Sequence, residues 1–308
     1  MLVRIISAAL LAATGICRET IGAGLYEAEL IDFLRGNYKT SYTLSYTSAR
    51  EALYESIDNV DNDVYAIYTN YSVYLPPGTS APTTHLYNNG MDCEHVWPQS
   101  LYTGTSPMKS DLHHLRPSKS TVNSSRGNKP FGEIPDYQTD TWYWLSQSQS
   151  SIPSSNIDEY SETKSGLFEP REDRKGDIAR TMFYFYTMYS EVADDDFFEE
   201  QKEILKTWHE ADPANEAEIE RTWAIASYQQ NKPNPFILDE SLIWRAFFYE
   251  GVIAGDINED GILNVLDLVS IVNLILTGET NQNADMNEDG TVNILDVVML
   301  ANMILYDN

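Results

Sequence analysis

The stretch that decides the fold lies in the first half of the chain. Residues 92–100 read DCEHVWPQS, and residues 110–133 read SDLHHLRPSKSTVNSSRGNKPFGE. In the first stretch the carboxylate of Glu94 directly precedes the imidazole of His95. Neighbouring side chains of a strand leave on opposite faces, so the two groups cannot simply chelate one ion together. We therefore expect them to do separate work at a shared site.

The second stretch predicts a strand followed by a short helix. DLHHLR (111–116) is expected to form the strand, which Pro117 ends. Ser118 can cap a helix on which Asn123 and Arg126, three residues apart, share a face. This order would bring an asparagine amide oxygen beside the carboxylate of the first stretch, and both groups are hard ligands that suit Mg²⁺.

The charge of the chain limits the partners that it can bind. Among 308 residues, 20 Lys and Arg face 47 Asp and Glu, for a net charge of −27. This balance argues against a broad basic surface for nucleic acid or anionic lipid but leaves room for a local patch. Between residues 101 and 130 the balance reverses, because Asp111 is the single acid there. The cations of this segment are Lys109, Arg116, Lys119, Arg126 and Lys129. A phosphate backbone could be accommodated here.

These motifs resemble the ββα-metal, or His-Me finger, core of secreted bacterial nucleases of the endonuclease I type. The resembling segments are CEHVWPQS (93–100), DLHHLRPS (111–118), VNSSRGNKPFGE (122–133), KGDIARTMFYFYTMY (175–189) and DPANEAEIERTWAIASYQQNKPNPFI (212–237). The resemblance implies a domain over residues 25–248 of the α+β class, in which a ββα-metal core lies within a helix-rich domain.

The resemblance also implies roles for three residues of the core. His95 would act as general base on the attacking water, and Glu94 and Asn123 would hold one Mg²⁺, which Mn²⁺ could replace. The implied activity is hydrolysis of DNA, and often RNA, to 5′-phosphate ends with little sequence preference.

Further residues of the core are assigned by the same resemblance. The family pattern keeps the first histidine of the pair, so His113 would support the site by hydrogen bonding, with Asp111 orienting it. Some relatives use an arginine from the loop between the two core motifs, where this chain has only Lys109. Arg126 or Arg116 would then contact the phosphate.

The N-terminus predicts a secretory signal peptide over residues 1–22. Arg4 precedes an apolar run from Ile5 to Ile16, which is short for a membrane span and is followed by small residues. A buried first helix is the alternative. After cleavage Cys93 would be the only cysteine, so we expect a packed free thiol and no intrachain disulfide. We expect a secreted, extracellular protein with no membrane insertion after signal cleavage.

The C-terminal part of the chain repeats itself. GDINEDGILNVLDLVSIVNLIL (255–276) returns as ADMNEDGTVNILDVVMLANMIL (284–305). Each copy places oxygen ligands and a glycine at the spacing of a calcium loop, and hard oxygen donors favour Ca²⁺. The expected ligands of the first ion are Asp256, Asn258, Asp260, Ile262, Asn264 and Asp267. Those of the second ion are Asp285, Asn287, Asp289, Thr291, Asn293 and Asp296.

Only a loop and a following helix recur, and this unit resembles a type I dockerin over residues 252–306. The resemblance implies a small all-α domain that binds two Ca²⁺ and docks onto a cohesin of a cell-surface or cellulosome-type scaffold. The implied contacts with the cohesin are Val265, Leu266, Ile294 and Leu295. Acidic surface turns without metal are the alternative interpretation.

Two other functions stay open. The chain could be a non-catalytic scaffold or adhesion component that keeps its dockerin, although Glu94, His95 and Asn123 are intact. It could also be a polysaccharide-degrading hydrolase, which needs two facing carboxylates, but no paired motif stands out. Zinc proteolysis is disfavoured, because the sequence has no HExxH helix.

Overall fold

The computed structural model describes residues 20–249, 251, 253–287 and 289–306. These residues form two compact units, a large one over residues 27–246 and a small one that joins residues 20–26 to the C-terminal part of the chain. The large unit mixes helices with short strands and the small unit is helical, so the predicted α+β class is confirmed. Residues 1–19 of the predicted signal peptide lie outside the described residues. Within the described residues, no helix has the length and apolar character of a membrane span.

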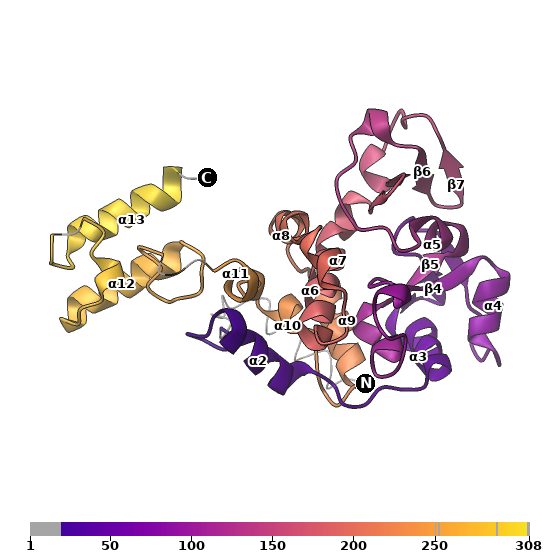
Figure 1. Cartoon of the computed structure of the whole chain (residues 1–308), viewed down its shortest axis with the longest axis horizontal. Coiled ribbons are helices and arrows are strands. Elements are labelled where there is room, and N and C mark those ends of the chain that lie inside the picture. Colours follow the sequence, from indigo (N-terminus) through magenta and orange to yellow (C-terminus); the bar gives the residue numbers. More distant parts are fainter. Residues whose placement is uncertain (1–19, 250, 252, 288, 307–308) are drawn as a thin grey trace. The chain divides into compact units, whose positions relative to one another are not determined.

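The centre of the large unit is an antiparallel hairpin followed by a helix (Figure 1). Strand β4 (Met91–His95) pairs with β5 (Leu115–Lys119), and α5 (Ser120–Arg126) follows directly. This arrangement agrees with the expected order of strand, strand and helix.

Pro117 lies inside β5, opposite Cys93, and does not end the strand as predicted. The strand tolerates a proline here because the pair exchanges no ladder hydrogen bonds. The carbonyl of Cys93 instead accepts from the side chain of Asn123, and the carbonyl of Pro117 accepts from the backbone of Ile67. The unused carbonyl of β4 thus becomes an attachment point for α5.

Two further predictions for this segment are wrong. DLHHLR forms a strand only in its last two residues, which begin β5. Before them the carboxylate of Asp111 accepts from the backbone N–H of His113, and a 3-10 turn follows over Leu112–His114. A side chain that bonds to nearby backbone in this way competes with strand pairing. Ser118 is a buried strand residue and caps nothing, since the helix begins at Ser120.

The N-terminal part of the large unit supplies three helices and a small sheet. Its helices are α2 (Glu27–Tyr38), α3 (Tyr46–Ala52) with a π-helical turn (Leu53–Ile57), and α4 (Pro82–Asn88). A three-stranded antiparallel sheet comprises β1 (Asn59–Val60), β2 (Asp63–Tyr65) and β3 (Ser72–Tyr74). The sequence predicts one strand over residues 64–75, but the chain turns back within it, with Asn70 at a φ of 55°. Asparagine tolerates this left-handed conformation better than most residues.

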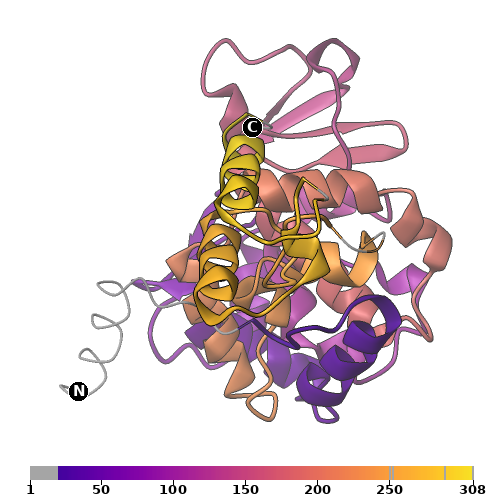
Figure 2. The same ribbon diagram turned by 90° about the vertical axis from the view of Figure 1, so that its left-hand side faces the viewer.

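A second antiparallel sheet lies at one edge of the large unit, away from α2 (Figures 1 and 2). Its order is β7-β6-β8-β9. The strands are β6 (Thr141–Trp144), β7 (Gln147–Gln149), β8 (Ser161–Lys164) and β9 (Leu167–Glu169). The segment 146–156, which the sequence predicts as a surface loop, therefore contributes a short edge strand before its exposed remainder.

The second half of the large unit is helical, as the sequence predicts. Its helices are α6 (Lys175–Tyr189), α7 (Asp195–Glu199), α8 (Lys202–Ala211), α9 (Glu216–Ala226), α10 (Pro235–Leu238) and α11 (Leu242–Phe247). Short 3-10 turns occur at Gln99–Leu101, Met108–Ser110, Asp136–Gln138, Ile157–Glu159, Glu172–Arg174 and, in the small unit, Gln282–Ala284. Helix α6 is almost entirely buried and forms the axis of this half. A Cβ at Gly176 would lie 2.0 Å from the carbonyl oxygen of Asp212, so only glycine fits there.

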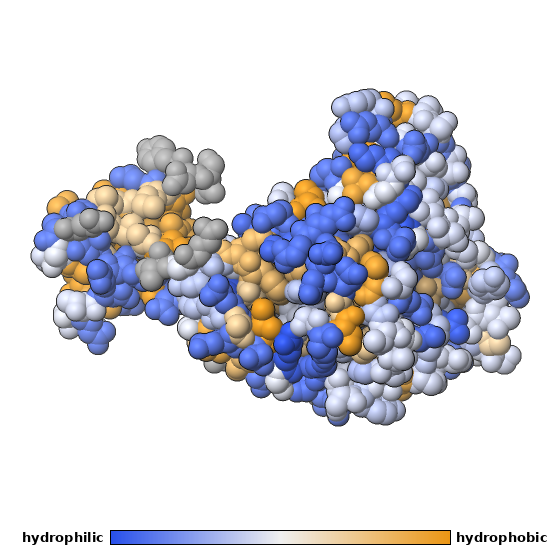
Figure 3. Space-filling view, viewed as in Figure 1, coloured by the Kyte–Doolittle hydropathy of each residue, from blue (hydrophilic) through white to orange (hydrophobic). Residues whose placement is uncertain are grey.

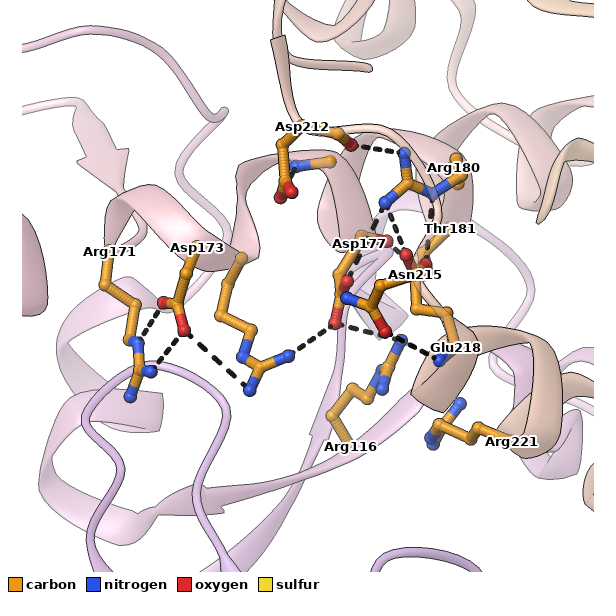
Figure 4. Close-up of polar contacts among 12 residues, drawn as sticks. Arg116, Arg171, Asp173, Asp177, Arg180, Thr181, Asp212, Asn215, Glu218 and Arg221 are labelled. Atoms are coloured by element: carbon orange, nitrogen blue, oxygen red, sulfur yellow. Dashed lines mark hydrogen bonds and ion pairs between the residues drawn. The ribbon is translucent and has the colours of Figure 1, made fainter. Parts of the chain in front are cut away.

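An ion-pair network crosses the start of α6 (Figure 4). Arg180 binds Glu218 through two contacts of 2.5 and 3.0 Å, and all of their side-chain atoms are buried or nearly so. Arg174 and Arg116 both reach one oxygen of Asp177, at 3.2 and 3.8 Å. Several opposite charges thus satisfy one another inside the large unit.

In the small unit, two helices follow the two repeated loops. Helices α12 (Val265–Thr277) and α13 (Ile294–Tyr306) pack around Ile271, Ala284 and Leu300. Their outer faces are also apolar, and the space-filling view shows hydrophobic residues gathered on the visible face of this unit (Figure 3). The exposed side chains include Val265, Leu266, Val269, Ile294, Leu295 and Val298.

Candidate active site

The hairpin and α5 place three of the predicted residues around one pocket, which we call the His95 pocket. Its volume is about 440 Å³. Glu94 and His95 come from the end of β4, and Asn123 comes from the middle of α5. The other residues that line it are Tyr46, Asp92, Cys93, Pro98, Gln99, Ser100, Gly127 and Asn128. A carboxylate, an imidazole and an amide therefore meet at one opening.

The hydrogen bonds of His95 define which of its nitrogens is basic. Nε2 lies 3.0 Å from the carbonyl oxygen of Lys109, which can only accept, so Nε2 carries the proton in the neutral ring. Nδ1 is then the free acceptor, and the amide of Gln99 donates to it at 3.1 Å. Burial, reinforced by the neighbouring His114, lowers the pKa of His95 to about 3. The ring is consequently neutral near pH 7, with its lone pair on Nδ1.

Glu94 is a buried carboxylate with two polar partners on one oxygen. Oε1 accepts from the hydroxyl of Tyr68 at 2.8 Å and lies 3.3 Å from the guanidinium of Arg126. Burial raises the pKa of Glu94 to about 7, although Arg126 and Tyr68 both act in the opposite direction. A further positive charge beside Glu94 would favour its ionised form.

Asn123 is the second predicted oxygen ligand. Its Nδ2 donates to the carbonyl of Cys93 at 3.3 Å, and nothing in the described part of the chain donates to its amide oxygen. No three His, Cys, Asp or Glu side chains converge on a metal position among the described residues. A cation at this pocket would therefore bind one carboxylate, one amide oxygen and water, and this set of donors fits Mg²⁺.

The two repeated loops of the small unit hold their carboxylates by equivalent hydrogen bonds. Asp256 accepts from the backbone N–H groups of Asp260 and Gly261 at 3.1 and 2.8 Å, and Asp285 makes the equivalent two bonds at the same distances. The last acid of each loop also accepts from three backbone N–H groups. These acids are Asp267 and Asp296. The backbone thus orders the carboxylates of each loop, although no three of those described converge on one point, and hard oxygens of this kind suit Ca²⁺.

The sequence profile of the family described as Endonuclease I matches residues 27–240, which is more than half of the chain. The chain belongs to the Endonuclease I family. The profile described as Dockerin type I domain matches residues 254–305, so an Endonuclease I domain is followed by a dockerin. Both resemblances seen in the sequence are therefore confirmed.

Three relatives carry names that agree with this family. The chain is 30% identical over 214 residues to an extracellular ribonuclease of Bacillus subtilis (strain 168), and 28% identical over 221 residues to one of Bacillus amyloliquefaciens. Each match covers 63% of this chain and 65% of the relative, so the chain spans less than two thirds of the length of these relatives. It is also 28% identical over 124 residues to Endonuclease-1 of Buchnera aphidicola subsp. Acyrthosiphon pisum (strain APS), which covers 40% and 43% of the two chains.

The other predicted residues of the Endonuclease I domain do not line the His95 pocket. Arg126 is fully buried and binds Glu94 and the carbonyl groups of residues 95 and 96, so it cannot contact a phosphate directly without rearrangement. Arg116 belongs to the ion-pair network. His113 is buried, with Nε2 bonded to the carbonyl of Lys232. Asp111 accepts from the backbone of His113 and does not orient its ring.

Several residues that shape the Endonuclease I site escape sequence reasoning. His114, not His113, packs against the ring of His95, with 5.2 Å between centroids. Gln99 bonds to His95 and Tyr68 bonds to Glu94. The centroid of the Tyr46 ring lies 5.4 Å from that of His95. Tyr46 and Tyr68 are distant in sequence and carry no motif. Gln99 lies within the quoted stretch 92–100, and that proximity was the available signal.

In the dockerin, the predicted cohesin contacts lie on the surface, and one predicted calcium ligand caps a helix. Val265, Leu266, Ile294 and Leu295 are all exposed. The amide oxygen of Asn264 accepts from the backbone N–H of Leu266 and caps α12, a role that the sequence interpretation does not foresee. The buried thiol of Cys93 is free, as expected.

Proposed function

We propose that this protein is a secreted, metal-dependent endonuclease that hydrolyses phosphodiester bonds of DNA or RNA with little sequence preference. The observation that carries the proposal is the neutral His95, whose basic Nδ1 faces the pocket that Glu94 and Asn123 also line. Membership of the Endonuclease I family and the names of the relatives support it.

The proposed reaction uses His95 as general base. An attacking water takes the place of the Gln99 amide at Nδ1 and gives its proton to that nitrogen as its oxygen bonds to phosphorus. The bond from phosphorus to the 3′ oxygen breaks, and the leaving oxygen takes a proton from solvent water, which gives a 5′-phosphate and a 3′-hydroxyl. The hydrogen bond from Nε2 to the carbonyl of Lys109 holds the ring in the required tautomer and stabilises its protonated form.

A divalent cation would be held by Glu94 and Asn123. Mg²⁺, or Mn²⁺ in its place, would polarise the phosphate and neutralise the charge that develops on the leaving oxygen. Tyr68 and Arg126 position the carboxylate for this task, since both bind its Oε1 and leave Oε2 without a hydrogen bond in the described part of the chain. Arg126 is thus proposed as a positioning residue.

The proposal is tested by cleavage of supercoiled plasmid and of a single-stranded RNA. The unmodified protein should cut with Mg²⁺ and not with EDTA, and His95→Ala should cut at least about a hundredfold more slowly. His85→Ala is the matched control, because His85 lies on α4 and bonds to the carbonyl of Tyr74 outside the pocket. Intact DNA and RNA after incubation with Mg²⁺ would contradict the proposal, and release of reducing sugar from polysaccharide instead would favour a glycosidase.

We further propose that the dockerin binds two Ca²⁺ and attaches the nuclease to a cohesin of an extracellular scaffold. The ordered carboxylates of the two loops support the first part, and the exposed apolar face of α12 and α13 supports the second. Isothermal titration with Ca²⁺ should give two sites. Binding to a panel of type I cohesins should require Ca²⁺ and be weakened in the double variant Leu266→Asp, Leu295→Asp. Cohesin binding unchanged by EDTA would contradict this assignment.

A further inference from the structure

A second pocket lies beside the His95 pocket and shares a residue with it. This pocket, which we call the Arg50 pocket, has a volume of about 180 Å³. Asp92 lines both pockets, and the guanidinium of Arg50 lies 4.5 Å from the ring centroid of Tyr46, which lines the His95 pocket. The two pockets therefore adjoin at Asp92.

Arg50 is a cation without an anionic partner. Most of the other described arginines bind a carboxylate, as Arg35, Arg126 and Arg221 do. In the part of the chain that the structure describes, no acidic side chain lies within ion-pairing distance of Arg50, and its buried Nε has no hydrogen-bond partner. In a protein of net charge −27, an uncompensated arginine at a pocket is unusual. A phosphate matches the fork of donors that a guanidinium presents.

The lining of the Arg50 pocket also offers an aromatic ring and hydroxyl groups. Tyr87, on α4, is 64% exposed and lines this pocket. Thr83, Thr84 and the buried Tyr54 line it as well. Nucleobases stack on exposed aromatic side chains whatever their sequence, which suits an enzyme with little sequence preference.

Asp92 limits how a nucleotide can lie here. Its Oδ1 accepts from the backbone N–H of Cys93 at 2.8 Å, so the carboxylate is held at the boundary between the two pockets. A phosphate would be repelled by Asp92 and drawn to Arg50. The carboxylate can accept from a sugar hydroxyl or from a base amino group, and both are donors in nucleotides.

We propose that the Arg50 pocket is a nucleotide subsite. It takes a nucleotide next to the scissile phosphate, with the neighbouring phosphate on Arg50 and the base stacked on Tyr87. This inference rests on the proposed nuclease activity, because it assigns a further part of the same substrate. Arg50 and Tyr87 act in binding the strand, whereas His95, Glu94 and Asn123 act at the bond that breaks.

The test compares a polymer with a substrate too small to reach the subsite. The full-length variants Arg50→Ala and Tyr87→Ala are assayed with Mg²⁺ on a fluorescent single-stranded oligonucleotide and on bis(p-nitrophenyl) phosphate. For the oligonucleotide, loss of one stacking or phosphate contact should raise KM about tenfold or more with kcat little changed. Hydrolysis of the small diester should stay at the level of the unmodified enzyme. Tyr87→Phe should keep the low KM, and Tyr137→Ala, at another exposed tyrosine, is the matched control.

Each outcome decides the inference. An unchanged KM for the oligonucleotide would overturn it, as would an equal loss on both substrates, which would mean that Arg50 only supports Tyr46 and His95. Fluorescence anisotropy of the labelled oligonucleotide in EDTA provides a readout independent of catalysis. If the unmodified protein cleaves neither substrate, the nuclease proposal fails, while weaker binding of the oligonucleotide by both variants would still support the subsite and equal binding would overturn it.

Discussion

Two pockets of the Endonuclease I domain touch the β4–β5 hairpin and differ in how their charges are balanced. The ion-pair pocket, of about 360 Å³, is lined by Arg116, Arg174 and Arg221 and by Asp58, Asp177 and Glu218. The His95 pocket is lined by two acids, a neutral imidazole and amides. In the first pocket opposite charges satisfy one another, while in the second Oε2 of Glu94 and the amide oxygen of Asn123 accept no hydrogen bond from the described residues. The difference supports the proposal that the His95 pocket carries the chemistry, and we expect the ion-pair pocket to stabilise the fold instead.

The strongest test of this comparison removes the base. His95→Ala should lower kcat by about 10²- to 10⁴-fold, because a general base contributes that much to proton transfer. The melting temperature should stay close to that of the unmodified protein, because the variant removes the base without unfolding the domain. Initial rates on plasmid DNA and a thermal melt of the same sample measure both. A loss of less than tenfold would mean that another group takes the proton.

A break in the ion-pair network should act on stability instead. Arg180→Met leaves Glu218 buried beside Asp177 without its partner, and loss of one member of a buried pair costs about 3–5 kcal/mol. Urea unfolding at pH 7 measures the change. Lys202→Met, which removes an exposed pair with Glu199, is the control and should cost less than about 1 kcal/mol. Equal effects of the two variants would contradict a structural role for the network.

A smaller effect is expected when one metal ligand is removed. Asn123→Ala deletes the amide oxygen but leaves Glu94, so the Mg²⁺ concentration for half-maximal cleavage should rise by about tenfold to a hundredfold. Saturating Mg²⁺ should restore much of the rate. Asn123→Asp, which keeps an oxygen at this position, should retain tighter binding of Mg²⁺ than the alanine variant. The same Mg²⁺ dependence in all three proteins would exclude Asn123 as a ligand.

The smallest effect concerns the pH dependence of stability. Burial and the nearby Asp177 raise the pKa of Glu218 to about 7, against the influence of Arg180. A carboxyl group with a raised pKa in the folded state stabilises the protein while it is protonated, and this contribution is lost as the pH rises from about 4.5 through 7. In Glu218→Gln the unfolding free energy should therefore decline less over this interval, by on the order of 1 kcal/mol. Parallel pH profiles from urea unfolding would contradict this.

The features that could be predicted from the sequence depend on local spacing. Each of the two repeated loops has its acidic residues and its glycine within a dozen residues. The order of Asp256, Gly261 and Asp267 therefore already predicts the turn of the first loop. Because Glu94 and His95 are neighbours in a strand, the sequence likewise predicts that their side chains point to opposite faces of β4.

The partners of the cationic side chains between residues 101 and 130 could not be predicted in this way. Arg126 turns inward to Glu94, Arg116 joins Asp177, and Lys129 bonds to the hydroxyl of Thr163. Their partners come from distant segments, and local sequence does not say which side chain meets a buried acid. The histidines show the same limit, because the 3-10 turn at Leu112–His114 decides that His114 and not His113 reaches His95.

The hydrogen bond from Asn123 to the carbonyl of Cys93 has a further consequence for association. A two-stranded hairpin leaves the outer edge of β4 ready to pair with a strand of another chain. Helix α5 covers that edge at Cys93, whose outward carbonyl accepts from the side chain of Asn123. The asparagine that presents an oxygen to the pocket thus also occupies an outward acceptor of the edge strand, which we expect to oppose pairing with another chain. A substitution there is expected to affect solubility as well as chemistry.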